Sequence, residues 1–445
     1  MAEERSVALP APDELEVARL GEARISSPLR GISAPFVNDS SRVLACNDAA
    51  EVEARRAKGE PLAAFESAGP RGELFFDPDS TGCGIVTCGG LCPGLNDVIR
   101  SLFMTAHHQY GIRRVLGFRY GYAGLSAKSS YAEPLFLESE TVGRVHRHGG
   151  TLLGSSRGAQ DPADMVDTLV AWKIGILFAV GGDGTLRGAS ALCQEIERRG
   201  LKISVIAIPK TIDNDLMWTQ RTFGLATAVE AAQAPIAAAH NEATGAWNGV
   251  GVVKLMGRHA GFIAANATLA SGDVNYCLVP EVRFSLEGEG GLLSVLEQRL
   301  KKRRHAVLVV AEGAGQELVE EAGETETDAS GNLRLKDIGV FLKEKIEEHL
   351  ASRQMDHTVK YIDPSYTIRS LPANSMDSAF CQVLGQHAVH AGMAGRTDMM
   401  VGFWSHRFTH VPLHLVVSAR KEMDPSGEIW QRVLQTTGQP AHMMG

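Results

Sequence analysis

The 445-residue sequence predicts an α/β fold in which two domains of βαβ units carry mainly parallel sheets. Two observations lead to this fold class. From Gly84 onward, short β-branched runs alternate with helix-length segments, which is the pattern of βαβ units. The strand-like runs are also apolar almost throughout, as strands are when helices cover both faces of a parallel sheet.

The individual elements follow from local patterns. A helix is expected to begin with Asp161 as N-cap and Pro162 in its first turn. A longer helix over 223–243 is expected to be interrupted at Pro235. Strands are expected at residues 84–88, 114–118, 174–180, 204–208, 249–255 and 305–311.

The composition suggests four segments. Residues 1–80 lack sustained periodicity and are interpreted as an N-terminal extension that covers a core or makes contacts. Residues 81–230 form a first domain, which a helical and then strand-like stretch at 370–400 would complete. Residues 231–369 form a second domain, and 401–445 a C-terminal segment.

Charge and cysteine content limit the function classes. The net charge of −8 is spread along the chain apart from an acidic stretch over 317–328, so nucleic acid is not an expected partner. The chain contains neither a secretory signal nor an apolar run of about 18 residues, which excludes a membrane span.

Seven cysteines, an odd number, fit reduced thiols in the cytoplasm. Cys83, Cys88 and Cys92 form no CxxC pair, which argues against zinc.

Two glycine-rich loops follow predicted strands, where ligands bind in parallel sheets. In CGGLCPGLND (88–97) the backbone can approach an anion closely, although a plain tight turn would look similar. In AVGGDGTLRGA (179–189) helix-start amides can hold phosphate oxygens, and Asp183 can reach a Mg²⁺ bound to them. A structural turn with an N-cap aspartate is the alternative. Because NAD kinases and lipid kinases share GGDGT, this string indicates a phosphoryl-donor site and no more.

Two further strand ends carry charged residues. In IPKTIDND (208–215), burying two acids unpaired would cost several kcal/mol, so a catalytic loop is favoured over a surface Asx turn. Asp213 is a candidate general base, Lys210 a charge stabiliser and Thr211 a hydroxyl contact. In VVKLMGRHAGFIA (252–264), Arg258 could dock a phosphorylated or hydroxylated substrate, and AEGAGQE places Glu312 at another strand end.

Six motifs follow one another along the chain: CGGLCPGLN, GGDGT, PKTIDND, KLMGRHAGF, AEG and YIDPSYTIR. In this order they resemble the 6-phosphofructokinase family over residues 84–381. The extension, Lys210 and DPSYTIR are similar to its long-chain branch in plants, trypanosomatids and some bacteria. The resemblance implies two Rossmann-like domains, with 81–230 binding the nucleotide and 231–369 the sugar phosphate. It further implies fructose 6-phosphate and ATP as substrates, Mg²⁺ as cofactor, and a cytoplasmic homotetramer of a glycolytic kinase.

The resemblance also assigns roles to individual residues. Asp213 matches the proton acceptor for the sugar 1-hydroxyl, with Lys210 on the transferring phosphate, and Asp183 matches the Mg²⁺ position. The nucleotide site corresponds to Gly89, Arg157, Gly158, Gly182, Asp183, Gly184 and Thr185. The sugar phosphate site corresponds to Thr211, Ile212, Asp213, Asp215, Met256, Gly257, Arg258, Glu312, Lys360, Tyr366, Thr367, Ile368 and Arg369.

Two positions depart from short bacterial relatives. Lys360 stands where many have an arginine for the 6-phosphate, which keeps the charge but loses the bidentate fork. Asn248-Gly249 stands where those relatives place another phosphate-binding arginine, donated across a subunit interface. The contribution of that arginine to cooperativity is therefore not expected here.

The phosphoryl donor depends on two residues. In the family, an aspartate at the position of Gly184 intrudes on the ATP α-phosphate and favours pyrophosphate, so glycine favours ATP. Lys210 is usual in pyrophosphate enzymes, and a pyrophosphate-dependent phosphofructokinase is the alternative. A catalytically silent nucleotide-binding regulatory subunit is a remoter one, because it would not need Asp183, Asp213 and Asp215. An NAD or lipid kinase would share GGDGT but would not need the set Arg258, Glu312, Tyr366 and Arg369.

Overall fold

The computed structural model describes residues 9–31, 35–128, 133–319 and 335–445. Within them the chain forms two compact units, each gathered from stretches far apart in the sequence. Unit 1 consists of Met1–Thr211, Leu216–Phe223 and Ser375–Arg420, and unit 2 of Ile212–Asp215, Gly224–Asn374 and Lys421–Gly445. The chain therefore changes unit within PKTIDND. The acidic stretch over 317–328 falls largely outside the described residues.

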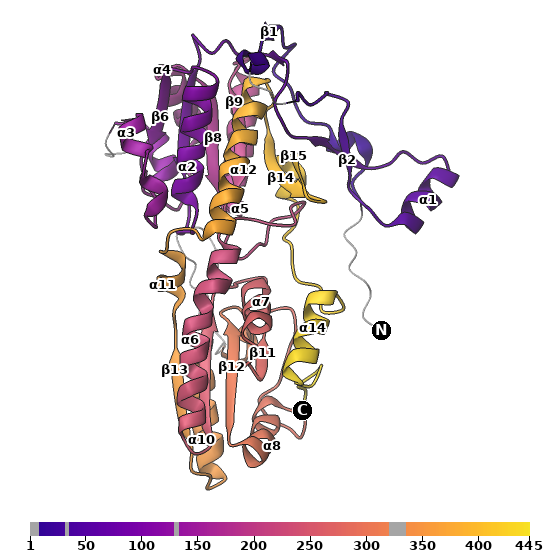
Figure 1. The fold of residues 1–445 in the computed structure, drawn as a ribbon, viewed down its shortest axis with the longest axis vertical. Coiled ribbons are helices and arrows are strands. Elements are labelled where there is room, and N and C mark those ends of the chain that lie inside the picture. Colours follow the sequence, from indigo (N-terminus) through magenta and orange to yellow (C-terminus); the bar gives the residue numbers. More distant parts are fainter. Residues whose placement is uncertain (1–8, 32–34, 129–132, 320–334) are drawn as a thin grey trace. The chain divides into compact units, whose positions relative to one another are not determined.

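Unit 1 is built on a sheet that is parallel at its centre and antiparallel at its ends (Figure 1). Its strands are β2 (Arg42–Leu44), β3 (Ala64–Ser67), β5 (Gly82–Thr87), β6 (Arg114–Phe118), β7 (Leu135–Phe136), β8 (Ile174–Gly181), β9 (Ser204–Pro209), β14 (Met399–Trp404) and β15 (Arg407–Pro412). They lie in the order β2-β3-β15-β14-β9-β8-β5-β6-β7. Four predicted strands are confirmed as β5, β6, β8 and β9. β1 (Ile25–Ser26) and β4 (Glu73–Leu74) form a separate antiparallel pair.

Helices cover both faces of this sheet. The helices of unit 1 are α1 (Ala49–Ala57), α2 (Leu95–Met104), α3 (Ser139–Val142), α4 (Pro162–Ala171), α5 (Asp183–Arg198), α12 (Ser375–Met393) and α13 (Leu413–Val416). Of these, α1 has no buried residue and lies away from the sheet (Figure 1). The predicted N-cap is confirmed, because the Asp161 side chain accepts a hydrogen bond from the N–H of Ala163. α2 and α12 lie side by side, and Gly392 of α12 packs against Ile176. The next strand residue, Leu177, faces the other side, as strand alternation requires.

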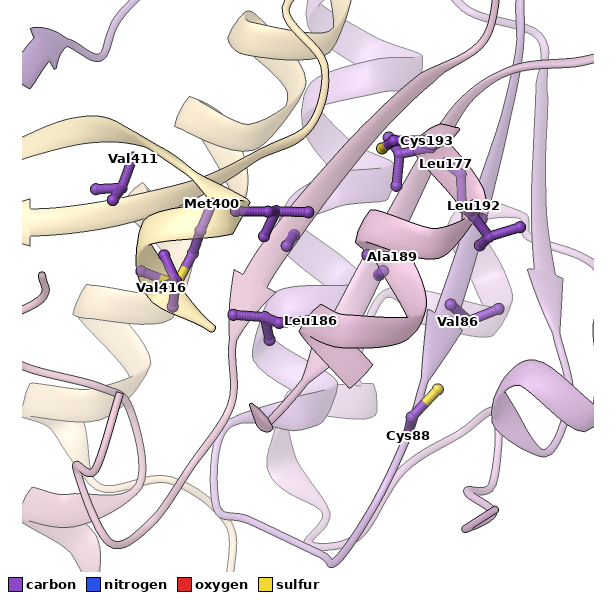
Figure 2. Packing of buried hydrophobic residues seen from close by; sticks show 14 of the residues in the cluster. Val86, Cys88, Leu177, Leu186, Ala189, Leu192, Cys193, Met400, Val411 and Val416 are labelled. Atoms are coloured by element: carbon purple, nitrogen blue, oxygen red, sulfur yellow. The ribbon is translucent and has the colours of Figure 1, made fainter. Parts of the chain in front are cut away.

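The core on that other side packs α5 against the sheet (Figure 2). Leu186, Ala189 and Leu192 of α5 lie one or two helical turns apart and pack against Leu177 and Val86 of the sheet. All five side chains are fully buried. Burial of this stripe fixes α5, so its first turn has a defined position at the end of β8.

The strand order contains a topological switch point between β5 and β8. From β5 the chain first adds β6 on one side and later β8 on the other. Ligands in open α/β sheets bind where the order reverses in this way, outside the carboxyl ends of the strands. The two glycine-rich loops, 88–94 and 181–185, follow these two strands. The fold therefore puts them at the expected ligand position.

Unit 2 contains a parallel sheet in the order β11-β12-β10-β13. Its strands are β10 (Gly249–Leu255), β11 (Tyr276–Leu278), β12 (His305–Ala311) and β13 (Thr358–Ile362). Its helices are α6 (Leu225–Gly245), α7 (Phe262–Ser271), α8 (Leu292–Arg303), α9 (Gln316–Val319), α10 (Ile338–Ser352), α11 (Ser365–Arg369) and α14 (Glu428–Thr437). α6, α7 and α14 share a core on one face, while α8 and α10 share a core on the other. β10 and β12 confirm the last two predicted strands.

The predicted interruption of the long helix is wrong, because α6 continues through Pro235. Proline removes one intrahelical hydrogen bond, but the rest of the helix is held by its packing. Its buried stripe consists of Ala228, Ala232, Ile236, Ala239 and Ala243, all in the core with α7.

The observed units depart from the predicted ranges at two further places. The second unit begins its main stretch at Gly224 rather than 231, because the whole of α6 packs in its core. The segment 401–445 is divided after Arg420, since β15 belongs to the sheet of unit 1 while Trp430 of α14 is buried in unit 2. The described residues up to position 80 fall within unit 1.

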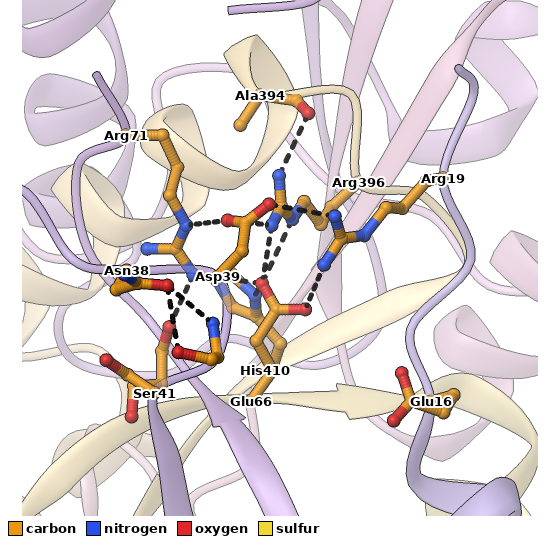
Figure 3. Close-up of polar contacts among 12 residues, drawn as sticks. Glu16, Arg19, Asn38, Asp39, Ser41, Glu66, Arg71, Ala394, Arg396 and His410 are labelled. Atoms are coloured by element: carbon orange, nitrogen blue, oxygen red, sulfur yellow. Dashed lines mark hydrogen bonds and ion pairs between the residues drawn. The ribbon is translucent and has the colours of Figure 1, made fainter. Parts of the chain in front are cut away.

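A buried ionic cluster fastens the first 80 residues into unit 1 (Figure 3). Glu66 on β3 lies 2.9 Å from a guanidinium nitrogen of both Arg71 and Arg396. Asp39 contacts the same two arginines at 2.8 and 2.6 Å. His410 on β15 lies 3.3 Å from Glu66, but burial lowers the pKa of its imidazole, so the arginines carry the positive charge at neutral pH. The extension is therefore an integral part of the unit.

Within the described ranges, no helix combines the length and apolar character needed to cross a bilayer. The seven cysteines all lie in those ranges and form no disulfide there.

Replacing Glu66 by glutamine should lower the free energy of unfolding by about 3–5 kcal/mol, because two buried arginines would lose their main counter-charge. Urea unfolding followed by circular dichroism measures the change. Glu22→Gln is the matched control, since Glu22 pairs with Arg24 on the surface and should matter by less than about 0.5 kcal/mol. Equal effects of the two changes would contradict a stabilising role of the cluster.

Candidate active site

In unit 1, the Lys210 ammonium lies against the glycine loop that follows β5. Lys210 is buried directly after β9, and its Nζ donates a hydrogen bond to the carbonyl of Gly90 at 2.7 Å. A Cβ on Gly89 would lie only 3.1 Å from that nitrogen. A second loop closes in from 155–156, where Ser155 Oγ donates to the Gly89 carbonyl at 2.6 Å and Gly89 N donates to Ser156 O at 3.0 Å. The Lys210 ammonium, the glycine loop after β5 and the segment 155–156 thus meet at one edge of the sheet.

Arg157 joins the same place. Its Nη2 would lie 3.7 Å from a Cβ on Gly90, so the guanidinium lies over the glycine loop. The next residue, Gly158, has a positive φ of 101°, a backbone conformation that glycine adopts readily. Two positive side chains, Lys210 and Arg157, therefore approach the loop, as an anion-binding site requires.

The first turn of α5 presents backbone amides beside this loop. Gly182 is the N-cap residue, and Thr185 N donates to its carbonyl at 2.8 Å. Among the described residues, nothing lies within 4 Å of the position that a Cβ on Gly184 would take. The helix start can therefore receive a negatively charged group, and the space next to Gly184 is open.

Asp183 opens α5 and is paired with arginines. Arg187, one turn later, contacts both carboxylate oxygens at 3.2 Å, and Arg420 lies 3.6 Å from one of them. The described part of the chain contains no cluster of three or more His, Cys, Asp or Glu side chains arranged to hold a metal ion. One carboxylate suffices for Mg²⁺ when substrate phosphates supply further oxygens, so Asp183 fits that ion only together with a phosphorylated ligand.

Unit 2 carries the acidic end of the loop, Ile212 to Asp215. Asn214 adopts a left-handed φ of 57°, which asparagine tolerates better than most residues. Asp213 is partly buried, with its Oδ1 atom shielded from solvent. Its other oxygen, Oδ2, lies 3.4 Å from the backbone nitrogen of Arg258. The turn therefore holds the candidate base against the loop that follows β10.

This environment changes the basicity of Asp213. Burial raises the pKa of its carboxyl well above the usual range, and the negative charges of Asp215 and Glu312 raise it further. The backbone N–H and the guanidinium of Arg258 act in the opposite direction but do not prevail. A carboxylate with a raised pKa is a stronger base once deprotonated, so Asp213 suits proton abstraction from an alcohol.

Two glycines allow the loops after β10 and β12 to pack together. Gly257 has a φ of 127°, which disfavours any residue with a side chain. Gly313 lies so close to Arg258 that a Cβ would come within 1.9 Å of the Arg258 carbonyl oxygen. The backbone of Glu312 is fixed by a 2.9 Å hydrogen bond to Leu255 O. The loop after β10, which carries Arg258, and the loop after β12, which carries Glu312, consequently pack directly against each other.

α11 adds a second arginine to this group. The Arg369 guanidinium stacks on the Tyr366 ring, 4.3 Å from its centroid, and Tyr366 is 72% exposed. Burial raises the pKa of Glu312, while the charges of Arg258, Lys254 and Arg369 oppose the rise. Arg258 and Arg369 therefore both lie near Glu312, with an aromatic ring available to a ligand.

Some residues assigned by resemblance lie elsewhere. The side chains of Met256 and Ile368 are buried in the core with α6 and α7, so only their backbone can reach a ligand. Thr367 is exposed on α11. Lys360 is exposed in the middle of β13, beside Gly251 and roughly 13 Å from the end of β10 where Arg258 follows. The structure does not bring Lys360 to Arg258 within unit 2.

Comparison with known proteins identifies the family. A family profile described as "Phosphofructokinase" matches residues 82–392. The chain belongs to the phosphofructokinase family. It is 44% identical to a Borreliella burgdorferi protein named ATP-dependent 6-phosphofructokinase, over 97% of this chain and 98% of the relative. A Trypanosoma brucei brucei protein of the same name is 50% identical, over 84% of this chain and 76% of the relative.

A solved structure shows the same phosphofructokinase fold. The pyrophosphate-dependent phosphofructokinase from Marinobacter aquaeolei matches with a TM-score of 0.67 over 80% of this chain and 91% of that one. At 22% sequence identity, this likeness concerns the fold and not the donor.

Lys254 is a structural residue of this site that was not predicted from the sequence. Its Nζ lies 2.7 Å from Asp337, the N-cap residue of α10, and 3.0 Å from Asp363, just before α11. Lys254 thereby ties the end of β10 to the start of the helix that carries Arg369. The signal was a lysine in the otherwise apolar run Val252 to Leu255, but its partners are more than 80 residues away in the sequence.

Replacing Gly313 by alanine should lower the free energy of unfolding by about 1–3 kcal/mol, because the added Cβ cannot fit against Arg258. Thermal or urea unfolding measures the loss. Gly245→Ala is the control, since nothing described lies within 4 Å of its Cβ position at the end of α6, and alanine favours a helix. If the two variants unfold alike, the two motifs do not depend on this contact.

Proposed function

We propose that this protein transfers the terminal phosphoryl group of ATP to the 1-hydroxyl of fructose 6-phosphate, giving fructose 1,6-bisphosphate and ADP. The observation that carries the proposal is the similarity to the Borreliella burgdorferi protein named ATP-dependent 6-phosphofructokinase, at 44% identity over 97% of this chain. The two halves of the candidate site support it. Unit 1 offers an anion site at a helix N-terminus, and unit 2 a base with two arginines.

The open space beside Gly184 supports ATP as the donor. An aspartate there would put a negative charge on the first turn of α5, where the α-phosphate of ATP would approach. Lys210 supports the alternative donor, pyrophosphate, because its ammonium already lies in the glycine loop. The pyrophosphate-dependent neighbour of known structure is too distant in sequence to decide between them.

In the proposed mechanism, Asp213 takes the proton of the sugar 1-hydroxyl as that oxygen attacks the terminal phosphorus. The bond from this phosphorus to the bridging oxygen breaks, and ADP leaves with the electron pair. The Lys210 ammonium stabilises negative charge on the transferring group, and Arg258 and Arg369 hold the sugar phosphate. Asp183, with phosphate oxygens of the donor, would hold Mg²⁺, which neutralises phosphate charge when bound.

We also propose a cytoplasmic homotetramer. The thiols of all seven cysteines, unlinked in the described chain, support a reducing compartment. The homotetramer is proposed from the resemblance to the family, and light scattering coupled to size-exclusion chromatography tests it.

The donor is tested by measuring fructose 1,6-bisphosphate in a coupled assay with Mg²⁺ and either ATP or pyrophosphate. ATP should support turnover at least about 100-fold better. Gly184→Asp should remove most of the turnover with ATP while leaving fructose 6-phosphate binding unchanged, since the new carboxylate enters open space.

Gly184→Ala is the matched control, because it adds a Cβ without charge and should retain the use of ATP. Turnover with pyrophosphate but not ATP in the unmodified protein would refute ATP as donor. Full ATP turnover in Gly184→Asp would remove Gly184 from the choice of donor.

Replacing Asp213 by asparagine should lower kcat by about 100- to 10,000-fold, the range typical of general-base catalysis. Fructose 6-phosphate affinity, measured by calorimetry, should change little, because asparagine keeps the shape and can still accept the Arg258 N–H. Near-normal turnover would exclude Asp213 as the base.

A further inference from the structure

The C-terminal segment of unit 2 is fastened to the loops of the candidate site. Glu281 accepts hydrogen bonds from Gly261 N, just before α7, at 2.9 Å, and from Met423 N at 2.8 Å. The Met423 side chain is buried in the core with α7 and α14. One carboxylate thus joins the end of the Arg258 motif to a segment that follows it by more than 160 residues.

Lys421, two residues before Met423, contacts the catalytic loop directly. Its backbone N–H donates to the carbonyl of Asp215 at 3.0 Å. Its ammonium lies over the Phe262 ring, 5.1 Å from the centroid. The side chain is therefore held between α7 and the loop that carries Asp213.

The carboxylate of Asp215 is the charge that acts on this ammonium, from the loop that carries Asp213. The other acids of this segment are Glu422, the next residue, and Glu281, which accepts the hydrogen bond from Met423 N. Burial is the larger effect and lowers the pKa of Lys421 to about 7, while Asp215 raises it. The positive charge of Lys421 is consequently present below this pH and is lost as the pH rises through it.

We propose that Lys421 is a positioning residue for phosphoryl transfer, whose ammonium balances the carboxylate of Asp215 and whose backbone holds the turn that presents Asp213. The inference rests on the proposed function. Without the ammonium, Arg258 alone would oppose the effect of the Asp215 charge on Asp213, and the loop would lose a side-chain anchor. The position of the base, more than substrate affinity, should then change.

The test compares Lys421→Met, Lys421→Arg and the control Arg432→Met, which removes a charge from an exposed position on α14. Steady-state kinetics with ATP, Mg²⁺ and fructose 6-phosphate should show a fall in kcat of about 10- to 100-fold for Lys421→Met, with KM for the sugar changed by less than about threefold. Lys421→Arg should retain most of kcat, because it keeps the charge, and Arg432→Met should resemble the unmodified protein.

The pH profile separates positioning from a merely structural role. In the unmodified protein, kcat should fall as the pH rises through about 7, because Lys421 then loses its charge. In Lys421→Arg this limb should disappear, since a guanidinium stays charged. This variant also decides the matter if Lys421→Met does not fold.

The proposal is overturned if Lys421→Met has the kcat of Arg432→Met, or if Lys421→Arg keeps the alkaline limb unchanged. If the unmodified protein forms no fructose 1,6-bisphosphate, the proposed function itself fails, and the inference falls with it. The two failures are therefore distinguishable.

Discussion

The proposed chemistry depends on the burial of Asp213 beside two other carboxylates, Asp215 and Glu312, at the edge of the parallel sheet of unit 2. Burial raises the pKa of the Asp213 carboxyl, and the negative charges of Asp215 and Glu312 raise it further. Such an arrangement is costly unless cations compensate it. Arg258 opposes the rise in the pKa of Asp213, and in our proposal the Lys421 ammonium balances the charge of Asp215. The site is thus a balance of charge that favours a strong base.

The fold creates this crowding through strand direction. Parallel strands end at the same edge of a sheet, so loops from distant parts of the sequence meet there. β10 and β12 bring Arg258 and Glu312 together, and Gly313 lets their loops touch. The larger sheet does the same at the ends of β5 and β8, where a glycine loop and the start of α5 form the proposed anion site.

The sequence predicted these parts because they are locally encoded. Apolar β-branched runs mark β6, β10 and β12, and glycines and charges at their ends mark the loops. The joining of β14 and β15 was not predicted, since the turn at Ser405 and His406 uses positive φ values of 47° and 60° without glycine or asparagine. The pairing of β3 with β15 places Glu66 opposite His410, and both are buried. It was not predicted, because a glutamate and a histidine in the sequence normally indicate exposed positions. Lys254 and Lys421 acquire their roles only through partners distant in the sequence.

The most direct test of the charge balance is the pH dependence of kcat/KM for fructose 6-phosphate. Because Asp213 must be deprotonated to act, the account predicts that activity falls as the pH drops through a limb far above the usual aspartate pKa of about 4. In Asp215→Asn this limb should move to lower pH, since one repelling charge is gone. An acid limb near pH 4 in the unmodified protein, or a limb that Asp215→Asn leaves in place, would contradict the account.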